Sequence, residues 1–401
     1  MFYINDNDGL LISYSQLFED IKNLPYIYTC KRFEHTYDFY VNLLSAIINQ
    51  IDLIIVDNNI SDKEYELLMK SNDLDNKVYK NNQNKIDFNN LYKEFLKYSN
   101  VNLTLFTSGT TGIPKKVTHK LASLNQSVKV SDYYNNDIWG LAYNPTHIAG
   151  LQVFFQALLN KNLIIDIYNT SRSFVLNSFN KYKITNLSAT PTFYRLLLPI
   201  PDEHSFLKQI TVGGEKSDKN LIIKLKESFK NARITNIYAS TEAGQILKSK
   251  GDFFKIENEK VKIENNEILI HKNLLGDNDF SKGEWYHTGD LIEYIDSNKE
   301  YFKIVSRKND VINSGGYMVN LTEIEELIIE IDGISDARVY SKSNAVVGNL
   351  ILCEIQLIEG VVLLEKDIKS KLAKRLQPHK IPRIINIVDF IQKTKTGKKI
   401  R

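Results

Sequence analysis

Short apolar runs alternate with helix-like segments over much of the chain. Residues 15–24 have the spacing of an amphipathic helix, and residues 51–56 (IDLIIV) form the continuous apolar run of a buried strand. Within residues 101–243, apolar runs such as NLTLF, KNLIIDIY, ITNLSAT, LKQITVGG and ARITNIYAS are separated by helical patterns such as residues 151–160. This alternation predicts βα units and a largely parallel sheet.

The pattern changes after this region. Residues 253–305 contain closely spaced strand-like runs joined by Asn, Gly and Asp, which predict a small antiparallel region. After Arg307 come a Gly-containing segment, a helix over 321–329, the strand pair DARVYSKS and LILCEIQLI, a basic helix and a Lys-rich end. We therefore expect an α/β fold, with a large N-terminal domain over 1–306 and a smaller, mobile α+β domain over 307–401. The Asn- and Lys-rich stretch 71–90 is expected to be a surface loop or a connection.

Composition restricts the class of protein without identifying it. The 401 residues are 43% hydrophobic and 25% charged, as expected for a soluble protein with more than one domain. Lys and Arg number 51 against 48 Asp and Glu, a balance too even to indicate a nucleic acid or a membrane surface as the main partner. Cys30 and Cys353 lie in separate apolar stretches, as buried reduced thiols do. With neither a signal peptide nor a membrane span in the sequence, we expect a cytoplasmic protein.

A phosphate-binding loop is predicted directly after the strand-like run NLTLF. The segment reads Thr107-Ser-Gly-Thr-Thr-Gly-Ile-Pro-Lys-Lys116. Glycines let the backbone bend so that N–H groups and hydroxyls converge on phosphate oxygens, whereas an ordinary polar turn is the alternative. The residues expected to bind a nucleotide phosphate are Thr107, Ser108, Gly109, Thr110, Thr111, Gly112 and Lys115.

This segment resembles the phosphate loop of the acyl-adenylate-forming superfamily, which includes acyl-CoA synthetases, peptide-synthetase adenylation domains and luciferases. The resemblance continues in order over residues 100–401, whereas residues 1–100 match loosely and look abbreviated. Tyr238-Ala-Ser-Thr241-Glu242 is similar to the family's Tyr-Gly-x-Thr-Glu. There the Tyr stacks on adenine, the Thr touches the α-phosphate and the Glu helps to hold Mg²⁺, a cation that suits a carboxylate. Without the resemblance, a Thr-Glu pair after a strand would indicate a helix N-terminus.

Two further segments resemble parts of the family's nucleotide site. Gly213-Gly214-Glu215 is similar to the turn that lies against the adenine. Residues 285–290 match Tyr-x-Thr-Gly-Asp, in which the residue equivalent to Asp290 takes both ribose hydroxyls. A carboxylate can accept two hydrogen bonds from a vicinal diol, so the residue type is chemically apt. A plain turn is the alternative at both places.

The segment that begins at Ser306 resembles the family's hinge and the start of its mobile domain. Arg307 is expected to contact the ribose or a phosphate, and Asn309 stands where the family has Asp or Lys as the pivot. The Ser314-Gly-Gly316 segment would enter the site during thiol transfer.

His147 and Lys398 complete the predicted site. His147 lies where the family has Pro-x-x-His-x-x-Gly at the acyl pocket, although one residue is missing here, and a core or capping His is the alternative. Lys398 ends a segment similar to Thr-x-x-Gly-Lys, whose Lys bridges the attacking carboxylate and the α-phosphate. Without the resemblance, KTKTGKKIR would be a basic tail, and its end is expected to be poorly ordered.

The resemblance implies an enzyme that uses ATP and Mg²⁺ to activate a carboxylic acid as its acyl-AMP and then transfers the acyl group to a thiol. The layout is most similar to compact acyl- or aryl-CoA ligases of the o-succinylbenzoate:CoA ligase type, which implies coenzyme A as the acceptor. Two alternatives remain: a stand-alone adenylation enzyme that loads a phosphopantetheinyl carrier protein, and a catalytically degenerate nucleotide-binding protein. The residues predicted to be catalytic are Lys398, Thr241, Glu242 and His147, with Glu242 as the metal ligand.

Overall fold

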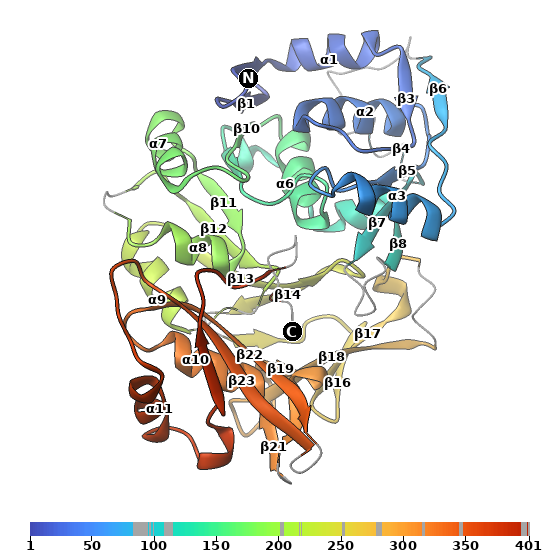
Figure 1. Cartoon of the computed structure of the whole chain (residues 1–401). Helices are drawn as coiled ribbons and strands as arrows, with labels where there is room; N and C mark the ends of the chain where they lie inside the picture. The colour runs from blue at the N-terminus through green and yellow to red at the C-terminus, as the bar shows by residue number, and fades with distance from the viewer. Residues whose placement is uncertain are drawn as a thin grey trace. The chain divides into compact units, whose positions relative to one another are not determined.

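The computed structural model describes residues 1–82, 95, 98, 100–107, 115–200, 204–215, 217, 219–250, 253–277, 283–314, 317–344, 348–393 and 399. It divides the chain into two compact units (Figure 1). The first comprises Met1–Asp252 and His271–Glu284, and the second Phe253–Ile270 and Trp285–Arg401. The predicted α/β class is confirmed. The first unit holds most of the strands that the sequence assigned to the N-terminal domain, whereas the strands within residues 253–307 fall in the second unit. The boundary at residue 307 stays a prediction.

The main sheet of the first unit has the order β14-β13-β12-β11-β9-β10-β1-β2. Its strands are β1 (Tyr3–Asn5), β2 (Leu10–Ile12), β9 (Ile138–Leu141), β10 (Leu163–Asp166), β11 (Asn186–Ala189), β12 (Gln209–Gly213), β13 (Arg233–Ser240) and β14 (Gly244–Lys250). All neighbours pair in parallel except β2 and β14, which are antiparallel to β1 and β13. The helices between parallel strands are α6 (Ile148–Leu159), α7 (Arg172–Tyr182), α8 (Pro191–Leu197) and α9 (Lys219–Ser228). The predicted βα units are therefore confirmed.

Alternation along the strands places a hydrophobic core on each face of this sheet. Ile164 packs into a core that includes α6, whereas the next residue, Ile165, packs into a core formed with α7, α8 and α9. Tyr3 and Ile4 on β1 divide between the two cores in the same way. Successive side chains of a strand point to opposite faces, so continuous apolar runs are what a sheet covered on both faces requires.

A second sheet of the first unit has the order β4-β5-β7-β8. Its strands are β4 (Cys30–Lys31), β5 (Leu53–Ile55), β7 (Asn102–Thr107) and β8 (Lys115–Lys120), and nearby elements are α1 (Tyr14–Asn23), α2 (Thr36–Ile48), α3 (Asp62–Ser71), α5 (Leu121–Leu124) and the pair β3 (Tyr26–Tyr28) and β6 (Val78–Lys80). The predicted helix over 15–24 is α1, which begins where the Ser13 side chain accepts from the Gln16 N–H. The expectation of a loop over 71–90 is wrong for β6, because those three residues pair with β3.

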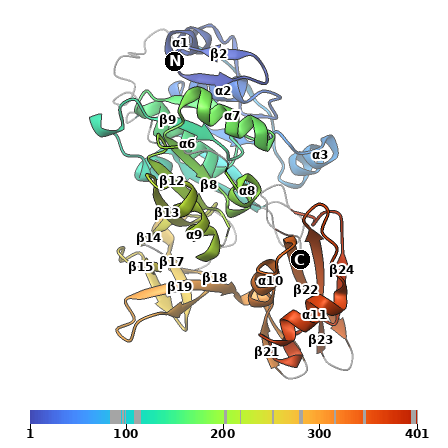
Figure 2. The same cartoon turned by 90° about the vertical axis from the view of Figure 1, so that its left-hand side faces the viewer.

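The second unit contains an antiparallel sheet of order β16-β17-β18-β19-β15 and a three-stranded sheet, β22-β23-β24. The elements are β15 (Phe253–Lys255), β16 (Val261–Glu264), β17 (Glu267–His271), β18 (Trp285–Tyr294), β19 (Tyr301–Arg307), the hairpin β20 (Val311–Ser314) and β21 (Tyr317–Asn320), α10 (Leu321–Ile329), β22 (Ile334–Asn344), β23 (Gly348–Leu357), α11 (Glu365–Ala373) and β24 (Ile384–Ile387). Figure 2 shows α10 and α11 beside the three-stranded sheet, with which they share one hydrophobic core. The predicted antiparallel region, the helix over 321–329 and the strand pair are confirmed.

Membrane spans and cysteines are two features about which the composition made predictions. None of the helices in the described residues is long and apolar enough to cross a membrane. Cys30 and Cys353 are buried free thiols, as predicted. Burial raises the pKa of the Cys30 thiol to about 11, and it raises the pKa of Cys353 further.

Asp166 is a carboxylic acid in the interior of the first unit. The Tyr3 hydroxyl donates to its Oδ2, and the Tyr168 N–H donates to its Oδ1 at 3.0 Å. Burial raises the pKa of Asp166 to about 6, against an ordinary value of 3.8, although the hydrogen bond from Tyr3 acts in the opposite direction. The carboxyl group is therefore costly to ionise in the folded chain.

We predict that Asp166→Asn changes how stability depends on pH. Because the folded-state pKa is raised, the unfolded chain releases this proton at lower pH, and the wild type loses stability as pH rises from about 4 to about 6. Relative to wild type, the free energy of unfolding of the variant should rise by on the order of 3 kcal/mol over that interval. Urea unfolding is followed by tryptophan fluorescence in a Trp285→Phe background. Trp139, in the first unit, is then the only tryptophan left in the sequence. The exposed Asp132→Asn is the control, and a stability difference that does not change with pH contradicts the prediction.

Candidate active site

The first unit brings several predicted segments to one end of its parallel strands. The register of β12 and β13 places Gly213 opposite Ile237, so the Gly-Gly-Glu turn and Tyr238 begin at the same level. Tyr143, two residues after β9, donates its hydroxyl to the Gly213 carbonyl at 3.1 Å. The carboxyl ends of parallel strands are where open α/β sheets bind ligands.

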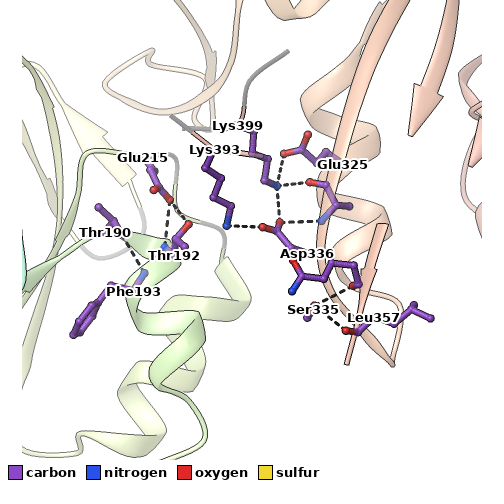
Figure 3. A network of polar contacts seen from close by, with 12 residues as sticks. Thr190, Thr192, Phe193, Glu215, Glu325, Ser335, Asp336, Leu357, Lys393 and Lys399 are labelled. Atoms are coloured by element: carbon purple, nitrogen blue, oxygen red, sulfur yellow. Dashed lines mark hydrogen bonds and ion pairs between the residues drawn. The ribbon is translucent and has the colours of Figure 1, made fainter. Parts of the chain in front are cut away.

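The Gly-Gly-Glu turn is held by the start of α8. Gly214 has a φ of +84°, a conformation that favours glycine. The Glu215 carboxylate accepts from the Thr192 hydroxyl at 2.7 Å and from the Thr192 N–H at 3.3 Å (Figure 3). Thr190 caps α8 by accepting from the Phe193 N–H at 3.1 Å. Thr190 and Thr192 were not among the predicted site residues, although Thr-Pro-Thr directly after a strand was the available signal.

The Thr241–Glu242 turn joins β13 to β14, and a buried histidine holds it. His119 on β8 is 3% exposed, and its Nε2 lies 2.7 Å from the Thr241 carbonyl oxygen. Since a carbonyl only accepts, Nε2 carries the proton and donates. Burial lowers the pKa of His119, against the opposing effects of the Thr241 carbonyl and Glu242, which favours this neutral form. The Gly276 N–H donates to the Glu242 carbonyl at 2.8 Å.

The helix that follows His147 packs beside this turn. The register of β13 and β14 shifts between Tyr238 and Ala239, which is a β-bulge. Gly244, at the start of β14, has a φ of +66°, and a β-carbon there would lie 3.3 Å from Gln152 Nε2 and 3.8 Å from Ile148 Cδ1. Both side chains belong to the first turns of α6. The structure therefore brings the predicted His147 segment to the Thr241–Glu242 segment.

His147 itself pairs with an aspartate that the sequence analysis did not identify. Its Nε2 lies 3.1 Å from Asp57 Oδ2, and Asn144 Nδ2 donates to Asp57 Oδ1 at 2.9 Å. Burial would raise the pKa of Asp57, but the hydrogen bond from His147 and others outweigh it and the pKa is lowered. An ionised Asp57 fixes which imidazole nitrogen carries the proton. Gly150 is required nearby, because a β-carbon there would lie 2.1 Å from the Asn144 carbonyl oxygen.

Of the predicted phosphate loop, the structure describes the two ends. Thr107 and Lys115 are opposite each other in the β7–β8 ladder, so the segment between them begins and ends at one point. Lys115 is exposed. The predicted residues Ser108, Gly109, Thr110, Thr111 and Gly112 lie outside the described residues.

In the second unit, Asp290 and Arg307 form an ion pair. They are opposite each other in the β18–β19 register. Arg307 Nε donates to Asp290 Oδ1 at 2.8 Å, and Nη2 lies 3.5 Å from Oδ2. The Asp290 side chain is 7% exposed and that of Arg307 is 54% exposed. Asp290, predicted to bind the ribose, is therefore adjacent to Arg307, predicted to contact the ribose or a phosphate.

A buried glutamate, also missed by the sequence analysis, holds the turn before Asp290. Glu267 Oε1 accepts from the Gly289 N–H at 2.9 Å, and its Oε2 accepts from Lys308 Nζ at 2.6 Å and lies 3.0 Å from His287 Nδ1. Burial would raise the pKa of Glu267, but Lys308, His287 and Gly289 outweigh it and the pKa is lowered. Glu267 therefore ties the Thr-Gly-Asp turn to the residue that follows Arg307.

The remaining predicted features are only partly described. Lys398 lies outside the described residues, and the side chain of Asn309 is not described. Among the described residues, no group of three or more His, Cys, Asp or Glu side chains is arranged to hold a metal ion.

Two family models match parts of this chain. Residues 46–264 match the AMP-binding enzyme family, and residues 323–398 match the AMP-binding enzyme C-terminal domain. The chain belongs to the AMP-binding enzyme family. The resemblance inferred from the sequence is thus confirmed.

The similar curated proteins are ligases that join acids to coenzyme A. The 2-succinylbenzoate–CoA ligase of Oceanobacillus iheyensis is 24% identical over 343 residues, which are 77% of this chain and 70% of that protein. A 4-coumarate–CoA ligase of Humulus lupulus is 27% identical over 346 residues, which are 74% of this chain. This chain spans 62% of the length of the Humulus protein.

Solved structures of one such ligase share the fold. The o-succinylbenzoate coenzyme A synthetase of Bacillus subtilis in complex with AMP has a TM-score of 0.76 and 17% identity, over 99% of this chain and 93% of that one. The same enzyme with ATP and a magnesium ion has a TM-score of 0.74 and 18% identity, over 99% and 94%. Identities this low establish the fold alone.

We predict that Glu267→Ala loosens the turn that presents Asp290. The variant loses a hydrogen bond from the Gly289 N–H to a charged acceptor, a contribution of about 1.5–3 kcal/mol. Amide exchange in residues 286–292 should therefore accelerate by about 10- to 100-fold, as measured by hydrogen–deuterium exchange and mass spectrometry. Glu300→Gln, which weakens the more exposed pair with Lys255, is the control. Unchanged exchange in Glu267→Ala would show that Glu267 does not hold the turn.

Proposed function

We propose that this protein is an AMP-forming ligase that activates a carboxylic acid with ATP and transfers the acyl group to the thiol of coenzyme A. The observation that supports it most is the convergence of three turns at one end of β9, β12 and β13. These carry Gly213–Glu215, Thr241–Glu242 and the start of the His147 helix. The chain belongs to the AMP-binding enzyme family, and the similar curated proteins are named as CoA ligases. Both findings support the same reaction.

The chemistry has two steps. A carboxylate oxygen attacks the α-phosphorus, and pyrophosphate leaves with the bonding electrons. The thiol then loses its proton to solvent and its sulfur attacks the acyl carbon, and AMP leaves with the electrons of the acyl–oxygen bond. In the first step the Thr241 hydroxyl donates to an α-phosphate oxygen. Glu242 would hold Mg²⁺, whose charge would offset the negative charge on the phosphates.

The second unit supplies the ribose contacts in this proposal. The Asp290 carboxylate accepts from the ribose hydroxyls, and the hydrogen bond from Arg307 orients it. Residues 307–401 act as the mobile lid that carries Lys398. Support for a separate lid comes from its hydrophobic core, which is built from buried residues between Val319 and Ile385. The protein works in the cytoplasm.

A panel of carboxylic acids tests the reaction. The purified protein is incubated with ATP, Mg²⁺, coenzyme A and aryl, alkyl and dicarboxylic acids in turn, and AMP and acyl-CoA are measured by mass spectrometry. The proposal expects both products for at least one acid. AMP formation that needs a phosphopantetheinyl carrier protein in place of coenzyme A would contradict the assigned acceptor. Binding of ATP without acid-dependent AMP from any acid would contradict the reaction.

We predict that Glu242→Gln slows acyl-AMP formation by about 100-fold or more, because one preorganised charge is lost at the phosphates. Higher Mg²⁺ concentrations should restore part of the rate. The exposed Glu227→Gln on α9 is the matched control, and circular dichroism checks that both variants fold. A Glu242→Gln enzyme with wild-type turnover and an unchanged Mg²⁺ dependence would refute the metal assignment.

A further inference from the structure

The last part of the chain is attached to the second unit by ion pairs. Lys399 Nζ lies 2.7 Å from Glu325 Oε1 and 2.8 Å from Asp336 Oδ1, and it also donates to the Ala337 carbonyl. Lys393 Nζ lies 2.6 Å from Asp336 Oδ2. Figure 3 shows Lys399 between the two carboxylates and Lys393 on the other side of Asp336. We call Glu325, Asp336, Lys393 and Lys399 the tail clamp.

The clamp is half-buried and its charges balance. The side chains of Lys399, Glu325 and Asp336 are 16%, 9% and 16% exposed. The two carboxylates also accept from the backbone: Glu325 Oε2 accepts from the Val339 N–H at 2.9 Å, and Asp336 Oδ1 accepts from the Ala337 N–H at 2.8 Å. Buried charges are tolerated when they are paired and hydrogen-bonded in this way. Burial would raise the pKa of Asp336, but Lys399 and Lys393 outweigh it and the pKa is lowered.

The clamp is built on rigid elements. Glu325 lies on α10 and Asp336 on β22, and their neighbours Ile324 and Ala337 are fully buried in the core of the C-terminal sheet. Lys393 and Lys399 form an antiparallel bridge with each other. The two ends of the five-residue segment between them are therefore fixed to each other and to the core.

We infer that the tail clamp positions Lys398 for acyl-AMP formation, an inference that rests on the proposed function. A basic tail that only keeps a protein dissolved has solvated lysines and needs no buried acidic partners. Here the lysine next to Lys398 is half-buried between two carboxylates, and a second lysine, six residues earlier than Lys399, pairs with one of them. A cationic group stabilises a transition state when its position is fixed before the reaction. Lys399 is thus a positioning residue that does not touch the substrate.

Separate measurements of the two half-reactions test the clamp. Lys399→Met removes the charge and keeps most of the side-chain length, whereas Lys399→Arg keeps the charge. Lys399→Met should lower kcat for acyl-AMP formation by about 10- to 100-fold, the scale of a misplaced catalytic group. The KM values for ATP and acid should not change, and preformed acyl-AMP should be converted to thioester at the wild-type rate. Lys399→Arg should recover most of the activity, and Lys398→Ala sets the full loss.

The control is Lys380→Met, which removes an ion pair with Glu323 at 2.9 Å elsewhere in the same domain. It should leave both half-reactions unchanged. Brief trypsin digestion followed by mass spectrometry should release the chain end beyond Lys395 faster from Lys399→Met than from wild type or Lys380→Met.

Three outcomes would overturn the inference. Equal slowing of both half-reactions would mean that the clamp supports the fold rather than Lys398. Normal acyl-AMP formation despite faster trypsin release would mean that the clamp has no role in this step. A wild-type protein without acid-dependent activity would overturn the proposed function, and the role of the clamp with it, whereas the other two results count against the clamp alone.

Discussion

The parallel pairing of β9, β11, β12 and β13 is the constraint on which the candidate site of the first unit depends. The carboxyl ends of parallel strands lie at the same edge of a sheet. Residues that follow different strands therefore lie close together there, even when they are far apart in the sequence. Tyr143 after β9 reaches the Gly213 carbonyl at the end of β12 across 70 positions of sequence. Once the strands are in register, the Gly213–Glu215 turn and the Tyr238–Glu242 segment are neighbours.

Strand ends place the turns, and buried polar side chains then hold them. His119 fixes the Thr241 carbonyl, Asp57 fixes His147, and Glu267 fixes the Gly289 amide. Each of these groups would be costly to bury without a partner, so each defines one local arrangement of its turn. Electrostatic catalysis requires groups that do not reorganise during the reaction, and such anchors supply that rigidity.

The fold could largely be predicted because its elements have strong local patterns. The helix over residues 321–329 is α10 with the same bounds, and the apolar runs of the βα region are the parallel strands. The stretch 71–90 shows where local patterns fail, since its composition indicates a loop although Val78–Lys80 pairs with β3. A ladder to a distant strand overrides weak local preferences.

Candidate site residues could be predicted where they belong to a recognisable local motif. They were missed where their role depends on contact with a residue far away in the sequence. Asp290 and Arg307 could be named from their motifs, and the structure pairs them. His119 lies 122 positions from Thr241, and Asp57 lies 90 positions from His147. An isolated His or Asp in a sequence does not indicate which distant residue it will contact. Glu267 is similar, because its burial follows from the antiparallel sheet rather than from its neighbours in the chain.

The central claim is that an acid and ATP react on this protein before any thiol is involved. Exchange of labelled pyrophosphate into ATP measures that step directly, because acyl-AMP formation is reversible. With coenzyme A omitted, the account predicts exchange that requires both a carboxylic acid and Mg²⁺. Exchange that does not depend on the acid, or ATP binding without exchange for any acid, would contradict it.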